Sequence, residues 1–119
     1  MEQNLFTANG EPVAYIASDG ETIYTWGGSA VACLSGDKVY GWNGTHLGWF
    51  TDGVVYDGNG YRVGFLKGAC PSATYAAPAK YAKYAKYAKC AKHAAYARPA
   101  RSSSISSMSL EAFLKEGEV

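Results

Sequence analysis

The sequence predicts an all-β fold in which four β-hairpins surround a pseudo-four-fold axis and form a shallow closed barrel, followed by a low-complexity C-terminal tail with a short helix. Three observations lead to this fold class. An internal repeat fills residues 6–66, each repeat unit carries a turn signal at the same place, and the composition changes sharply after Cys70. In a chain of 119 residues, this change leaves room for one small folded domain.

The repeat consists of four segments that align without gaps. Each opens with an aromatic residue, has glycine four places on, and continues with Val or Leu, a small residue and two mostly bulky positions. The segments are 6–16, 24–34, 40–50 and 56–66. Self-similarity of this kind indicates copies of one supersecondary unit.

Turn signals identify that unit as a β-hairpin. Three units carry Asn-Gly and one carries Gly-Gly between apolar runs, which predicts two-residue turns with positive φ at both residues. These pairs lie at 9–10, 43–44, 59–60 and 27–28. A second set of turn signals separates the units, at 19–20, 36–37 and 52–53. Eight short strands follow from the two sets.

Strand alternation assigns side chains to two faces. It places Val13 and Tyr15 on one face and Ala14 and Ile16 on the other, and the same holds in the other units. The small residues at 14, 32, 48 and 64 are expected to face one another where space around the axis is tightest. Both faces are apolar, so one of them is expected to meet the tail, another subunit or a lipid surface.

The hairpin repeat resembles a known family. The Asn-Gly hairpins, the segment 10–16, the unit 39–50 and a basic tail ending in a Ser-rich motif are similar to the four-fold beta-flower proteins of bacteria. The resemblance covers residues 5 to about 68 and implies a shallow, square barrel. It implies no established activity, so it transfers no catalytic, cofactor-binding or metal-binding residues. Cys33 and the pair Gly27-Gly28 depart from the repeat, which makes the second hairpin the least regular.

Three regions follow: the hairpin domain (1–69), a basic Ala/Lys/Tyr tail (70–101) and a Ser-rich segment with a docking motif (102–119). Residues 1–70 carry seven acidic and three basic residues, whereas the remainder carries three acidic and eight basic residues. Interleaved Lys and Tyr are suited to phosphate neutralisation and base stacking, and equally to an anionic lipid surface. The candidate anionic-surface residues are Lys80, Lys83, Lys86, Lys89, Lys92, Arg98 and Arg101. A solvated linker or a self-docking tail is the alternative, and the pattern leaves helix and disorder both open.

The docking motif is a short amphipathic helix. Leu110, Phe113 and Leu114 share one face, and Ser109 is a suitable N-cap. The motif would occupy a groove on an unknown protein partner or fold back onto its own barrel.

The sequence gives little support for a catalytic site or a metal-binding site. His46 and His93 lack partners at ligand or triad spacing and are expected at the surface. Three cysteines without metal spacing are typical of reduced thiols, which indicates the cytoplasm. We expect no export signal, transmembrane segment or cofactor.

The sequence therefore favours a non-enzymatic interaction or scaffold module, cytoplasmic or peripheral at the membrane. A peripheral membrane or lipid-binding protein is the first alternative. A non-specific nucleic-acid binder acting through the tail is the second.

Overall fold

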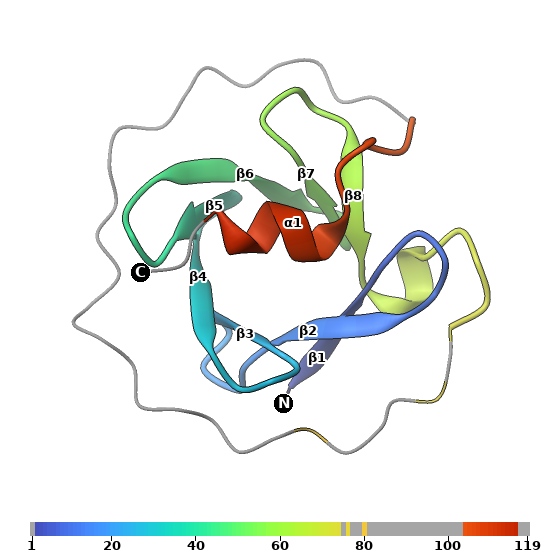
Figure 1. Cartoon of the computed structure of the whole chain (residues 1–119), viewed down its shortest axis with the longest axis horizontal. Coiled ribbons are helices and arrows are strands. Elements are labelled where there is room, and N and C mark those ends of the chain that lie inside the picture. The colour runs from blue at the N-terminus through green and yellow to red at the C-terminus, as the bar shows by residue number, and fades with distance from the viewer. Residues whose placement is uncertain (1, 75, 77–79, 81–103, 117–119) are drawn as a thin grey trace.

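The computed structural model describes residues 2–74, 76, 80 and 104–116. Eight antiparallel strands follow one another around a closed barrel, in which the last strand pairs with the first (Figure 1). The strands are β1 (Gln3–Phe6), β2 (Pro12–Ile16), β3 (Thr22–Thr25), β4 (Ala30–Ser35), β5 (Lys38–Gly41), β6 (His46–Thr51), β7 (Val54–Tyr56) and β8 (Arg62–Phe65). A 3-10 helix, η1 (Lys67–Ala69), follows β8, and a short α-helix, α1 (Leu110–Lys115), lies near the C-terminus. The predicted fold class is confirmed.

Each repeat unit is one hairpin, but its loop is one residue longer than the Asn-Gly signal predicts. The amide of Gly10 donates to the carbonyl of Thr7, and the Thr7 amide donates to the Glu11 carbonyl. The four repeat glycines have φ between 86° and 100°, whereas Asp52 alone has positive φ among the described non-glycine residues. This is a type I turn followed by a left-handed glycine. The predicted two-residue turn with positive φ at both positions occurs instead at Asp52-Gly53.

A β-bulge follows every one of these turns. Leu5 faces Ala14, but Phe6 faces Pro12, which leaves Val13 as the extra residue. The same register shift recurs in the other three hairpins. A bulge re-aims side chains, and the residues equivalent to Val13 therefore pack in the barrel interior. They are Val31, Leu47 and Val63. The predicted strict alternation, which places them with Cys33, Trp49 and Phe65, is wrong at these positions.

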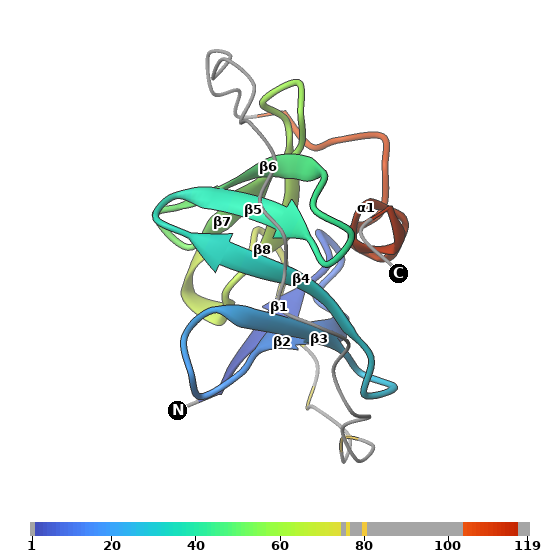
Figure 2. The same cartoon turned by 90° about the vertical axis from the view of Figure 1, so that its left-hand side faces the viewer.

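The barrel interior is closed at one end by α1, which lies across the ring of strands (Figures 1 and 2). Leu110, Phe113 and Leu114 are each 1% exposed and belong to the same apolar cluster as the inward-facing strand residues. The small residues make room for this helix. A Cβ on Gly64 would lie 2.8 Å from Leu110 Cδ1, and one on Gly48 would lie 3.1 Å from Phe113 Cζ and 2.0 Å from the Tyr56 carbonyl oxygen. The close approach expected across the axis is thus made to α1 and to a neighbouring strand.

The outer face of the barrel carries three buried aromatic clusters. They are Tyr15 with Tyr24, Cys33 with Tyr40 and Trp42, and Trp49 with Tyr56 and Phe65. Ala69 and Cys70 pack on the last of these, and Ala73 and Thr74 lie against the turn at Gly10. The chain therefore covers part of its own second apolar face after leaving β8.

The cysteines differ from the expectation of three reduced thiols. Cys33 is buried and disulfide-bonded to a partner outside the described residues, whereas Cys70 is a free thiol. The cysteine argument for a reducing compartment therefore does not apply to Cys33. Within the described ranges, neither helical segment has the length and apolar character of a membrane span.

Candidate functional site

An ammonium group is held on the outer face of the barrel, where the first hairpin meets the second. Lys80 Nζ lies 4.5 Å from the ring centroid of Tyr15, 5.2 Å from that of Trp26, and 3.0 Å from Glu2 Oε1. We call Tyr15, Trp26 and Glu2 the ammonium corner. Two aromatic faces and a carboxylate are the groups that attract a cation.

Strand register builds the corner. Tyr15 in β2 is directly opposite Tyr24 in β3, and their rings stack at 5.6 Å. Trp26 follows two residues after Tyr24, and its ring stands at 90° to that of Tyr15 at a centroid distance of 5.9 Å. Tyr15 is 1% exposed, so its position is fixed by packing. Tyr15 thus belongs to the sheet itself, whereas Trp26 lies in the turn that follows β3, where its amide donates to the Val13 carbonyl.

The predicted anionic-surface residues are described only in part. Lys80 is the first of the seven, and its ammonium contacts its own barrel. Lys83, Lys86, Lys89, Lys92, Arg98 and Arg101 lie outside the described residues.

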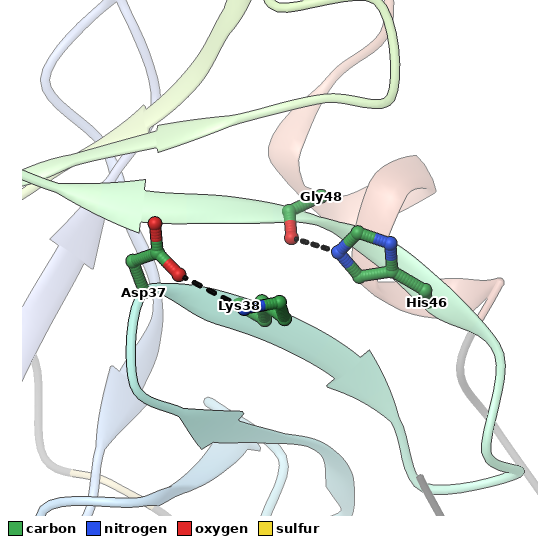
Figure 3. A network of polar contacts seen from close by, with 4 residues as sticks. All are labelled: Asp37, Lys38, His46 and Gly48. Carbon is green, nitrogen blue, oxygen red and sulfur yellow. Dashed lines mark hydrogen bonds and ion pairs between the residues drawn. The ribbon is translucent and has the colours of Figure 1, made fainter. Parts of the chain in front are cut away.

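His46 is buried, and its predicted surface position is wrong. It begins β6, where its ring packs between Tyr40 at 5.3 Å and Trp49 at 4.7 Å. Nε2 donates to the Gly48 carbonyl at 2.9 Å, because a carbonyl can only accept (Figure 3). Burial lowers the pKa of His46 below 6.5; the Gly48 carbonyl opposes this shift, nearby Lys38 adds to it, and Asp37 again opposes it. The ring is therefore a neutral packing element at pH 7.

A C-terminal strap, residues 104–109, fastens to the fourth hairpin. Ser106 Oγ donates to Asp57 Oδ2 at 2.6 Å, while Asp57 Oδ1 accepts from the amides of Asn59 and Tyr61. Arg62 N donates to the Ser104 carbonyl and Arg62 O accepts from Ser106 N, which forms a parallel bridge on β8. β1 pairs with β8 only at Phe65, so the strap completes β8 where β1 does not reach.

The strap delivers α1 to the barrel mouth. Ser109 accepts from the Ala112 amide as N-cap, and Asn43 Nδ2 donates to the Glu116 carbonyl beyond the helix C-terminus. The structure thus shows the second of the two arrangements considered for Leu110, Phe113 and Leu114, in which they fold back onto their own barrel.

Sequence reasoning missed the ammonium corner and the Asp57–Ser106 clasp. Both join residues far apart in the chain, Glu2 with Lys80 and Asp57 with Ser106. One usable signal was present: Tyr15 and Tyr24 are aligned by the turn between them, which predicts a cross-strand aromatic pair. Within the described part of the chain, His, Cys, Asp and Glu do not form a group of three that could hold a metal ion.

Comparison with known proteins agrees with this architecture. The profile of the 4-fold beta flower protein family matches residues 3–114, a range that includes the strap and most of α1 as well as the barrel. No curated protein and no solved structure matches the chain significantly. Since the matched range covers nearly the whole sequence, the chain belongs to the 4-fold beta flower protein family.

Proposed function

We propose that this protein is a non-enzymatic interaction module that presents a tethered basic segment to an anionic surface. The observation that carries the proposal is that the basic segment begins and ends at the barrel. Lys80 is held by the ammonium corner, and Ser104 and Ser106 are paired with β8. Residues 81–103 therefore connect two points that are both attached to the barrel.

The charge of this segment is opposite to that of the body that carries it. Residues 81–103 contain six basic residues, four tyrosines and no acidic residue, whereas residues 1–70 have a net charge of −4. Tethering both ends lowers the conformational entropy that ordering the segment on a surface would cost. Long-range attraction to a polyanion would thus act through residues 81–103 and not through the acidic barrel.

The packing of His46 supports a non-enzymatic role. Its ring nitrogen Nε2 is engaged by a backbone carbonyl, and its ring contacts Tyr40 and Trp49. A general acid or base must reach the proton it transfers, and this arrangement uses the imidazole for packing.

Two triple variants of the full chain test the proposal. Lys83→Gln/Lys86→Gln/Lys89→Gln removes three charges from the segment, and Lys38→Gln/Lys67→Gln/Lys115→Gln removes three from the body and α1. Both reach the same net charge, so they separate position from total charge. Flotation with vesicles of 30% phosphatidylserine, and fluorescence anisotropy with a 30-nucleotide single-stranded DNA, are measured from 50 to 300 mM NaCl.

We expect the first variant to lose about 100-fold in vesicle affinity, at roughly 1 kcal/mol for each lysine near the surface. On DNA, six contacts would give a log–log salt slope of about −4. The preferred surface decides between lipid and nucleic acid. Equal losses in the two triple variants, or no binding to either surface by the unmodified chain, would contradict the proposal.

A further inference from the structure

The ammonium corner has the properties of a preformed binding site. Tyr15 is fixed by its place in β2 and by stacking on Tyr24, and the ring of Trp26, in the turn after β3, stands at right angles to it. The ligand of the corner, Lys80, lies 11 residues beyond the end of η1 and reaches the corner from outside the sheet. Because Lys80 contributes nothing to the strands, its departure would leave the two rings in place.

We propose that the ammonium corner is a recognition site for the lysine side chain of an incoming peptide, with Lys80 as a displaceable internal occupant. The side chains of Lys80 and Glu2 are 25% and 30% exposed, so water reaches both charges and weakens their attraction. A competing lysine can therefore displace Lys80, which would release this end of the basic segment while Ser104 and Ser106 keep the other end on β8.

Trp26 supports a ligand-binding role, because it violates a packing rule. Its Nε1 is buried without a hydrogen-bond acceptor among the described residues. A buried, unsatisfied N–H is unfavourable, and phenylalanine would avoid it. Tryptophan, however, offers the strongest aromatic face for a cation. Local rules are broken in this way mainly at functional sites.

The geometry also selects the type of cation. The ammonium is compact, and it lies near both perpendicular rings and the carboxylate at once. A planar guanidinium would lie flat on one ring and turn its edge to the other. The corner should therefore prefer lysine to arginine.

The test is an NMR titration of the full ¹⁵N-labelled chain with Ac-Ala-Lys-Tyr-NH₂. Lys80→Ala should bind this peptide at least 10-fold more tightly than the unmodified chain, with saturable shifts of the Trp26 indole N–H. Ac-Ala-Arg-Tyr-NH₂ should bind more weakly and Ac-Ala-Gln-Tyr-NH₂ should not bind. Adding Glu2→Gln or Trp26→Phe to Lys80→Ala should weaken lysine-peptide binding several-fold, and neither change enlarges a buried side chain.

A measurement on the unmodified chain is independent of any variant. Ring currents should shift the Lys80 Hε protons upfield, and excess lysine peptide should return them to their free position. Equal affinity for the lysine and glutamine peptides, equal affinity of Lys80→Ala and the unmodified chain, or Lys80 protons that do not respond would each overturn the proposal.

A separate measurement identifies the molecule that supplies the lysine. Self-association of Lys80→Ala in sedimentation velocity, abolished by Glu2→Gln, would assign it to the basic segment of a second copy. A monomer that binds the peptide would assign it to another protein. Since no polyanion is present, this test can fail while the proposed surface binding holds, and the reverse.

Discussion

Replacing Gly64 with alanine is expected to push α1 away from the barrel, because the new methyl group would occupy the space of a buried leucine. A Cβ at position 64 would lie 2.8 Å from Leu110 Cδ1 and 3.1 Å from Cδ2. Leu110 is 1% exposed, so it has little space into which to retreat. Overpacking of this kind costs about 1–3 kcal/mol. In a domain of this size, each kcal/mol lowers Tm by about 4–8 °C.

A double-mutant cycle isolates the contact. Leu110→Ala alone should cost about 2–5 kcal/mol, because it leaves a cavity under α1. In Gly64→Ala/Leu110→Ala the added methyl group lies in the vacated space, so the two costs should fall short of their sum by about 1–3 kcal/mol.

Urea unfolding followed by tryptophan fluorescence measures each free energy of unfolding. Gly68→Ala is the matched control, because a Cβ at that position meets no atom within 4 Å and its φ is not positive. Additive costs in the double variant, or a Gly64→Ala variant as stable as Gly68→Ala, would refute the packing of α1 against β8.

Three further perturbations test other contacts. Burial lowers the folded-state pKa of His46 below its unfolded value of 6.5, so protonation favours the unfolded chain. The contribution of His46 to the free energy of unfolding should be fully present above pH 6.5. Below that pH the free energy of unfolding should fall by up to about 1.4 kcal/mol per pH unit. Ser106→Ala should cost about 1.5–3 kcal/mol, since it removes a 2.6 Å hydrogen bond to buried Asp57, and hydrogen exchange of the Ser106 and Arg62 amides should accelerate. Gly10→Ala should destabilise more than Gly20→Ala, because both glycines have positive φ but only at Gly10 would a Cβ also meet the Ala73 carbonyl, at 2.1 Å.

Each of these has its own control. His46→Gln should flatten the pH dependence between pH 5 and 6.5, and an unchanged slope would assign it to other groups. Ser107→Ala, at an exposed position of the strap, should change stability by less than about 0.5 kcal/mol. Equal thermal stability of the Gly10→Ala and Gly20→Ala variants would show that the segment around Ala73 does not pack on the first hairpin.

The repeat alone was enough to predict the hairpin barrel. The strand register was mispredicted because each hairpin has one loop residue more than the turn signal indicates. Asn-Gly is compatible with a two-residue turn and also with a type I turn followed by left-handed glycine. The second form adds a loop residue, and the bulge after it shifts the register. Val31 and Ala32 consequently share the interior cluster, although strict alternation separates them. Local turn signals do not determine which of the two turns forms. The turn with the bulge is favoured because it adds a branched side chain from each hairpin to the core.

The candidate site was less predictable, because its parts meet only in the folded chain. Nothing near Glu2 indicates that it will face Lys80, and nothing near Asp57 indicates Ser106. His46 was misplaced for a similar reason. A residue just after a turn is ordinarily exposed, but the neighbouring strand brings Tyr40 beside its ring.

The differences among the four repeats contain more information about α1 than their similarities. A four-fold barrel presents four equivalent walls, and a single helix cannot contact them equally. The equivalent small positions are alanine in β2 and β4 but glycine in β6 and β8. Phe113 and Leu110 approach these two glycines closely, and a methyl group at Gly64 would collide with Leu110. Loss of a Cβ in two adjacent repeats thus breaks the symmetry of the barrel and leaves room for Phe113 and Leu110 to pack against the backbone of β6 and β8. By the same reasoning, a family member with alanine at all four positions should lack an apolar C-terminal helix or pack it with smaller side chains. Across the family, the two helix side chains that face β6 and β8 should be shorter where the strand residues beneath them are larger.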